Sequence, residues 1–162
     1  MLVLPATNDA VLTGVIEPAL SLLPSSMATD EAKVMLLAIG RQESGFDARK
    51  QVHGPARGLW QFERNGVLGV MHGSATSSGA YALCSRLDVL WGSSSILSAL
   101  SENDELACGF ARLLLWSDPR PLPEVGNKLA AWDLYERCWR PGKPDYTRWG
   151  EAYSEAVVTI AG

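Results

Sequence analysis

The sequence has little that would anchor the chain in a membrane or export it. Its longest stretch without Asp, Glu, Lys or Arg runs from Asn65 to Ser85 and is rich in Gly, Ser and Thr. This stretch is too polar to form a span of ~20 apolar residues. The first basic residue is Lys33, so residues 1–32 lack the positive start of a signal peptide. We therefore expect a protein made in the cytoplasm, without membrane insertion, that depends on another agent to reach anything outside the cell.

Cysteine and histidine are also scarce. The three cysteines, Cys84, Cys108 and Cys138, are widely spaced without a CxxC, which excludes a disulfide framework and standard zinc modules. One pair, such as Cys84 with Cys108, stays open. Neither His53 nor His72 has a second ligand at metal spacing, so we expect no metal and no cofactor. The 14 Lys and Arg against 18 Asp and Glu give a net charge of −4, which argues against a nucleic-acid binder.

What is present fits one mostly helical domain covering residues 1–162. A chain of 162 residues with 47% hydrophobic and 20% charged residues can bury its own core. Helices are expected over residues 9–23 (kinked at Pro18), 30–44, 80–90, 103–116, 123–139 and from Asp145 onward. Repeated glycines break the pattern between residues 47 and 80, where Leu59 to Glu63 suits a small strand or hairpin. The expected fold is α+β, mostly α, with a small Gly-rich β-hairpin insert.

One carboxylate lies where its chemistry would be altered. Four residues share a face of the helix 30–44: Ala32, Leu36, Ile39 and Glu43. Dehydration beside this apolar stripe raises the pKa of a carboxyl group, and the negative end of a helix acts in the same direction. A glutamate kept protonated can act as a general acid towards a leaving group. The competing interpretation is a helix-end glutamate that turns to solvent, which is common among surface residues.

Two short motifs surround this glutamate. Gln42-Glu43-Ser44-Gly45-Phe46 is followed, after a short loop, by Gly54-Pro55-Ala56-Arg57-Gly58-Leu59-Trp60-Gln61-Phe62. The pair resembles the lytic transglycosylase branch of the lysozyme superfamily. In that family a helix ends in Glu-Ser, and a Gly-Leu-Met-Gln-Ile/Val/Phe segment follows. The resemblance covers residues 34–63 well and the remainder in outline, and it implies a lysozyme-like fold.

The resemblance also implies roles for individual residues. Glu43 would be the single catalytic acid/base, and Ser44 would orient either Glu43 or the substrate. The substrate cleft would be lined by Gly58, Leu59 and Gln61. Trp60 stands where the family has Met, which would change the shape of one wall without removing any chemistry.

The family's third motif, Ala-Tyr-Asn-x-Gly, has only a loose counterpart in Ala131-Trp132-Asp133-Leu134-Tyr135. Either Tyr135 takes over the role of the aromatic hydroxyl or the motif is absent. The competing interpretation is that Trp132, Tyr135 and Trp139 form a core stripe at helical spacing. The segment from Cys138 to Pro144 is similar to tails of phage-encoded wall-degrading domains.

Charge is unevenly distributed along the chain. Residues 137–148 contain Arg137, Arg140, Lys143 and Arg148 against Asp145 alone, a net charge of +3. Such a patch on an acidic protein would meet the carboxylates of peptidoglycan stem peptides. The competing interpretation is an ordinary solvated surface.

These observations lead us to expect a monomeric peptidoglycan lytic transglycosylase acting on glycan strands. Its substrate would be the β-1,4 bond between N-acetylmuramic acid and N-acetylglucosamine, broken through an oxocarbenium-like transition state. Glu43 would protonate the bridging oxygen and then serve as base for the muramoyl C6 hydroxyl, giving a 1,6-anhydro product. A holin-type membrane lesion or a phage particle would deliver it to the wall.

Two alternatives stay open. A hydrolytic muramidase, such as an endolysin or lysozyme, would use water and a second carboxylate, for which Glu63 is the candidate. On a strand, Leu59, Gln61 and Glu63 would share a face, so Glu63 would approach the cleft with Gln61. It would otherwise be a solvent-exposed charge before a turn. The other alternative is a non-catalytic phage tail module that keeps the same fold.

Overall fold

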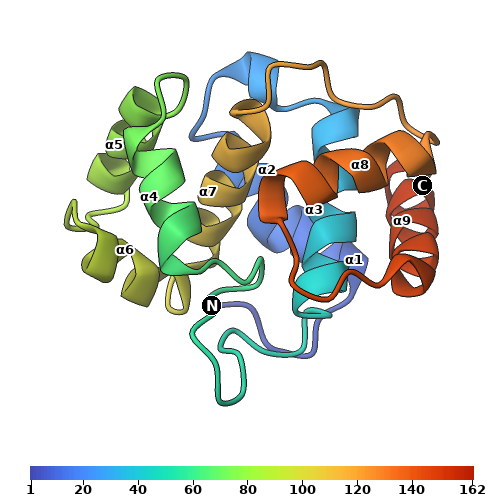
Figure 1. The fold of residues 1–162 in the computed structure, drawn as a ribbon, viewed down its shortest axis with the longest axis horizontal. Coiled ribbons are helices and arrows are strands. Elements are labelled where there is room, and N and C mark those ends of the chain that lie inside the picture. Colours follow the sequence, from blue (N-terminus) through green and yellow to red (C-terminus); the bar gives the residue numbers. More distant parts are fainter.

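The computed structural model describes residues 1–162 and consists of helices joined by loops, with no β-strand (Figure 1). The expectation of a mostly helical fold is confirmed. In chain order the elements are α1 (Asn8–Val11), the π-helical turn η1 (Leu12–Ile16), α2 (Glu17–Leu20), the 3₁₀ turn η2 (Ser25–Met27), α3 (Asp30–Glu43), α4 (Arg64–His72), α5 (Ser77–Arg86), α6 (Ser93–Leu100), α7 (Asp104–Trp116), α8 (Lys128–Trp139) and α9 (Tyr146–Ala161).

The predicted β-hairpin is wrong. Only two isolated bridges form, between Lys50 and Arg57 and between Arg57 and Phe62. Both Gly58 (φ 81°) and Gln61 (φ 52°) adopt left-handed backbone conformations, and the Gln61 N–H donates to the Gly58 carbonyl. The segment is therefore a tight turn, because left-handed residues cannot continue an extended strand.

The glycine-rich region also contains a helix, α4, that the sequence analysis did not predict because of its glycines. Gly66 and Gly69 lie within α4, whose Val67, Val70 and Met71 are buried. Tertiary burial of that face outweighs the low helix propensity of glycine, which is about 1 kcal/mol per residue. The short helix α6 was likewise not predicted, and it is held by buried Ile96 and Leu100.

Two predicted helices have different bounds from those expected. α8 begins after Asn127, whose side chain accepts a hydrogen bond from the Ala130 N–H, rather than near Pro123. The first helix is distorted just before Pro18, where η1 replaces the α-helical pattern. Proline has no N–H for the carbonyl four residues earlier and its ring crowds that carbonyl, so a wider turn accommodates it.

α3 lies in the middle of the molecule and is buried on nearly all sides (Figure 1). Every residue from Val34 to Gly40 is buried, and the helix packs against α9, α7 and η1. As the sequence predicts, Thr29 caps its start by accepting from the Ala32 N–H at 3.2 Å. Its last helical residue is Glu43, and Gly45 (φ 67°) turns the chain away.

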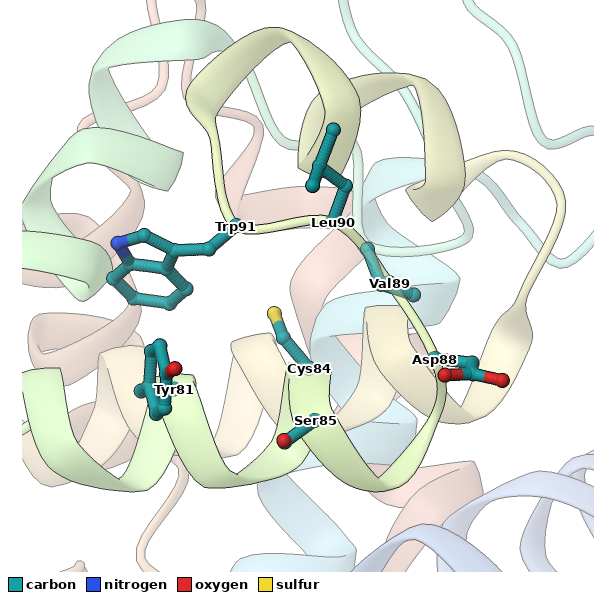
Figure 2. A pocket seen from close by; sticks show the side chains of 7 residues that line it. All are labelled: Tyr81, Cys84, Ser85, Asp88, Val89, Leu90 and Trp91. Atoms are coloured by element: carbon teal, nitrogen blue, oxygen red, sulfur yellow. The ribbon is translucent and has the colours of Figure 1, made fainter.

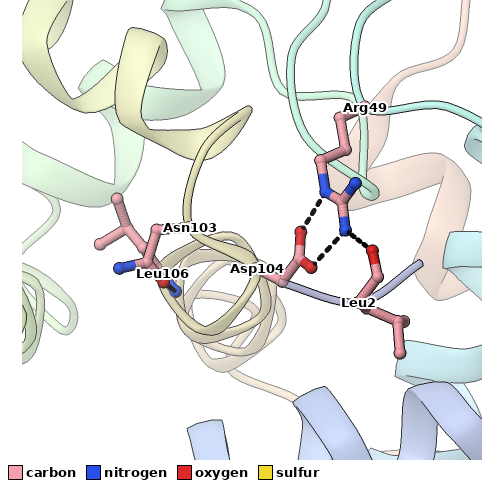
Figure 3. A network of polar contacts seen from close by, with 5 residues as sticks. All are labelled: Leu2, Arg49, Asn103, Asp104 and Leu106. Carbon is pink, nitrogen blue, oxygen red and sulfur yellow. Dashed lines mark hydrogen bonds and ion pairs between the residues drawn. The ribbon is translucent and has the colours of Figure 1, made fainter. Parts of the chain in front are cut away.

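One arginine in the loop between α3 and α4 binds both α7 and the N-terminal segment (Figure 3). Arg49 makes two hydrogen bonds to the carboxylate of Asp104, at 2.8 and 2.7 Å, and donates to the carbonyl of Leu2 at 2.5 Å. Asp104 is buried in the first turn of α7, next to the capping residue Asn103. This bidentate pair therefore joins the N-terminal segment, the loop and α7 at one point.

All three cysteines are free, so the pair left open by the sequence does not form. Burial raises the pKa of the Cys84 thiol to about 11. No helix combines the length and the apolar character that crossing a membrane requires.

Gly40 offers a sharp test of the packing around α3. A Cβ atom at this position would overlap the ring of Phe46 and lie 3.3 Å from the Trp60 Nε1 atom. We expect Gly40→Ala to lower the free energy of unfolding by about 1–3 kcal/mol, because the core must shift to admit the methyl group. Urea denaturation followed by circular dichroism measures the change.

The matched control is Gly69→Ala on α4, where an added Cβ would meet nothing within 4 Å. Alanine there should stabilise the protein by up to about 1 kcal/mol through helix propensity. Equal stability of the two variants would contradict the packing described for α3.

Candidate active site

A cleft of about 820 Å³ opens beside the end of α3. Its walls come from the loop before α4, the start of α4, the end of α7 with the residues after it, and the end of α8 with the turn that follows. Its lining side chains are mostly polar and include Glu43, Gln61, Glu63, Asp118, Arg137, Trp139 and Arg140. The volume falls within the ~300–1,000 Å³ of typical small-ligand sites.

Glu43, which lines this cleft, is contacted by Tyr135, a buried residue 92 positions away that does not line the cleft itself. The Tyr135 hydroxyl donates a short hydrogen bond to the Glu43 Oε2 atom. Tyr135 is buried on α8, and its ring stacks on that of Trp149 with centroids 5.1 Å apart and planes 11° apart. Because Trp149 is itself fully buried, the tyrosine hydroxyl has little freedom to move away from the carboxylate.

The pKa of Glu43 is raised above the ordinary value of 4.5. The largest cause is burial, which disfavours the charged form. The Tyr135 hydrogen bond and the positive charge of Arg148 act in the opposite direction, and the negative charge of Glu63 raises the pKa further. Burial also raises the pKa of Tyr135. The tyrosine therefore stays protonated and remains a donor to the carboxylate.

The end of α3 is closed by polar contacts. The Ser44 hydroxyl donates to the Gly40 carbonyl at 3.2 Å and accepts from the Phe46 N–H at 3.1 Å. Arg148, on α9, donates to the carbonyl of Arg41 at 2.9 Å. Its cation thus lies at the negative end of the helix, where it also favours the Glu43 carboxylate. Ser44 therefore ends the helix and does not line the cleft, and its hydroxyl makes no hydrogen bond to Glu43.

The second motif is placed differently from what the resemblance implies. Leu59 and Trp60 have no exposed surface and lie in the core, so the expectation that they line the cleft is corrected. Trp60 is held at both ends: its indole N–H donates to the Leu36 carbonyl at 2.8 Å, and its own carbonyl accepts from the Trp139 indole at 2.9 Å. These two motif residues, which the resemblance placed at the cleft, instead pack in the core.

Gly58 and Gln61 shape the turn at the edge of the cleft. Gly58 lies against α6, because an added Cβ would come within 2.8 Å of the Leu100 carbonyl oxygen. It does not itself line the cleft. The Gln61 side chain does, and its Nε2 atom donates to the Gly58 carbonyl at 2.9 Å. Of the four motif residues from 58 to 61, only Gln61 presents its side chain to the cleft.

Glu63 lines the same cleft as Glu43, although the strand that was expected to bring it there does not exist. Glu63 is the exposed residue immediately before α4. The tight turn from Gly58 to Gln61 brings it round to the cleft, and its charge raises the pKa of Glu43. The prediction that strand alternation would place Glu63 beside Gln61 was wrong, because no strand forms. Glu43 and Glu63 nevertheless line the same cleft.

The two aromatic residues of the third motif have separate roles. Trp132 is buried among the rings of Tyr135, Tyr146 and Trp149, with centroids 5.2 to 5.7 Å away, and it does not line the cleft. Trp132 is therefore a core residue, and the expectation that it contacts the substrate is corrected. Tyr135 belongs to the same buried stripe, yet its hydroxyl reaches Glu43.

Sequence reasoning missed Asp118, which forms part of the cleft wall together with Arg137 of the predicted basic segment. Asp118, after α7, accepts a 2.9 Å hydrogen bond from Arg137 on α8, and both residues line the cleft together with Trp139. No local pattern points to a pair 19 residues apart across a loop without regular structure. Elsewhere, no group of three or more His, Cys, Asp or Glu side chains is gathered as a metal ion would require.

Comparison of the chain with known protein families, with curated proteins and with solved structures found no match. What the protein does must therefore be inferred from its own residues. The cleft is lined by a carboxyl group of raised pKa, a second carboxylate and two arginines, and Tyr135, which does not itself line the cleft, donates a hydrogen bond to the first carboxyl group. Such a set can transfer a proton to and from a bound polar ligand.

The raised pKa of Glu43 has a consequence for stability. A carboxyl group whose pKa is higher in the folded protein contributes stability that is fully present below pH 4.5 and is lost as the pH rises through the folded-state pKa. Glu43→Gln removes this loss, while the glutamine oxygen can still accept from Tyr135. We expect the variant to be more stable than the parent at neutral pH, with the difference vanishing in acid.

Thermal unfolding between about pH 4 and pH 8 measures this difference. The control is Glu151→Gln, which neutralises an exposed carboxylate on α9 whose charge is not among those that shift the pKa of Glu43. A parent that remains more stable than the Glu43 variant at neutral pH would show that the charged form of Glu43 is not disfavoured.

Proposed function

We propose that the protein is a peptidoglycan lytic transglycosylase of lysozyme-like fold, with Glu43 as its single acid/base. The observation that carries this proposal is the dehydrated Glu43 carboxyl group, held by the Tyr135 hydroxyl at the wall of an 820 Å³ cleft. The two sequence motifs around residues 42–46 and 54–62 support it, since Glu43 and Gln61 face the same cavity. The expected substrate is the β-1,4 bond between N-acetylmuramic acid and N-acetylglucosamine.

In the first step Glu43 acts as an acid. Burial raises the pKa of the carboxyl group and so favours its protonated form, and that proton passes to the oxygen bridging the two sugars. The bond between this oxygen and C1 of the muramoyl residue then breaks, and positive charge develops at C1 and the ring oxygen. The Glu43 carboxylate left behind is stabilised by the Tyr135 hydroxyl and by Arg148, the two groups that lower its pKa.

In the second step Glu43 acts as a base. It takes the proton of the muramoyl C6 hydroxyl while that oxygen forms a bond to C1, which gives the 1,6-anhydro sugar. The proton lost in the first step is thereby recovered, and no water is consumed. A second carboxylate is not needed for this route, because the attacking hydroxyl is already tethered to the reacting sugar.

The wall formed by Arg137 and Arg140 suits the charge of this substrate. Both arginines line the cleft, and Arg140 is exposed. Arg137 is paired with Asp118, which leaves Arg140 as the free cation of the two. Stem-peptide carboxylates attached to the muramoyl residue would meet positive charge here, as the distribution of basic residues in the sequence predicts.

Glu43→Gln tests the proposal directly. The variant should fold but lose wall-degrading activity by ~10²–10⁴-fold, because glutamine cannot transfer the proton. Release of soluble fragments from purified peptidoglycan, with mass spectrometry of the fragments, measures both rate and chemistry. The parent should give fragments ending in 1,6-anhydro-muramic acid. A folded Glu43 variant that retains substantial activity would remove Glu43 from the mechanism.

A hydrolytic muramidase is the second candidate, and the position of Glu63 favours it. A carboxylate facing the same cleft as Glu43 is the group that would activate water in an inverting glycosidase or attack the sugar in a retaining one. Its products would carry reducing muramic ends, one water heavier than the anhydro form.

Glu63→Gln separates the two candidates. Under the transglycosylase mechanism this variant should lose much less activity than Glu43→Gln, since the substrate supplies the nucleophile. Equal losses, together with reducing ends in the parent's products, would establish the hydrolase instead. Binding to peptidoglycan without release of any fragment by the parent would identify a non-catalytic module.

A further inference from the structure

A second hollowed surface lies on α5 and the loop before α6, on the side of the molecule away from α8 and α9 (Figure 1). Tyr81 and Trp91 line two adjoining hollows here, of about 420 and 550 Å³. Figure 2 shows the indole ring of Trp91 facing Tyr81 across the opening, with Cys84 and Ser85 along α5. α4 packs against α5 and lines the Glu43 cleft with Gly66 and Gly69, so it lies between the two sites.

The two rings form an aromatic pair that remains accessible. Their centroids are 5.4 Å apart with planes at 69°, an edge-to-face arrangement. Tyr81 is 59% exposed. The pair thus presents ring surface to solvent, against which a ligand can pack.

Unused hydrogen-bonding groups surround the rings. The larger hollow is completed by Ser74, Ser77 and Ser78, and none of these hydroxyls makes a hydrogen bond within the protein. The indole N–H of Trp91 is likewise without a partner. Each hydroxyl can both donate and accept, so the hollow offers donors and acceptors directly beside aromatic faces.

This combination selects one class of ligand. No Lys, Arg or His lines either hollow, so the surface offers nothing to a phosphate or carboxylate, and Asp88 is its one charged residue. A pyranose ring has polarised C–H groups on its faces and hydroxyls around its edge. The C–H groups pack against the negative face of an aromatic ring, and the hydroxyls exchange hydrogen bonds with serine.

We infer that Tyr81, Trp91 and the serines of α5 form a second saccharide-binding site, separate from the Glu43 cleft, that takes an uncharged pyranose segment of a glycan chain. That this glycan is the wall polymer rests on the proposed function. A site of this kind would hold the protein on the polymer while the cleft engages another segment, which raises the local concentration of bonds to cut.

The test uses the full chain carrying Glu43→Gln, titrated with N-acetylglucosamine hexamer and followed by nuclear magnetic resonance. The indole N–H signal of Trp91 reports on the proposed site, and that of Trp139 reports on the cleft. We expect the Trp91 signal to move and saturate. Tyr81→Ala, and separately Ser77→Ala with Ser78→Ala, should each weaken this response by about tenfold or more without changing the response of Trp139.

The matched control is Leu129→Ala, which removes a 61% exposed apolar side chain from α8. It should leave the Trp91 response unchanged. A Trp91 signal that does not move at millimolar hexamer overturns the inference, as does a response unaffected by both α5 variants. A response at Trp91 with none at Trp139 would support this site while counting against the proposed function, so the two failures are distinguishable.

Discussion

The burial of α3 is the constraint on which the rest of the structure depends. A helix enclosed from Val34 to Gly40 can bring a polar side chain to the surface only near its ends. Glu43 is the last residue of that helix, so the same packing that forms the core also strips water from its carboxyl group. The raised pKa of Glu43 is thus a direct result of how the core is built, and Tyr135 and Arg148 limit the size of the shift.

The aromatic stripe joining α8 and α9 has a double purpose. Trp132, Tyr135 and Trp149 pack together with Tyr146 and Tyr153, which gives these two helices their shared core. A buried tyrosine hydroxyl must find an acceptor, and Glu43 is the acceptor that this one finds. The contact between the two residues therefore satisfies a packing requirement before it serves any chemistry.

The parts of this structure that the sequence could predict are those governed by local rules. The bounds of α3 could be predicted from its cap and its apolar residues. The position of Glu43 at the end of that helix could be predicted with them. The predicted hairpin was wrong because two left-handed residues replace the assumed alternation with a turn. Leu59, which the resemblance placed at the cleft, is buried in the core instead. α4 was missed because burial of one face outweighs its glycines, a tertiary effect that no local pattern contains. Asp118 was missed because only the tertiary structure brings it beside Arg137 and the cleft.

Trp60 makes hydrogen bonds to both of the helices that carry Glu43 and Tyr135. Its indole N–H is bound to the backbone of α3, which carries Glu43, and its carbonyl is bound by the last residue of α8, which carries Tyr135. The hydrogen bonds of this one core residue therefore link the helix of the acid to the helix of the phenol, in addition to the direct contact between Tyr135 and Glu43.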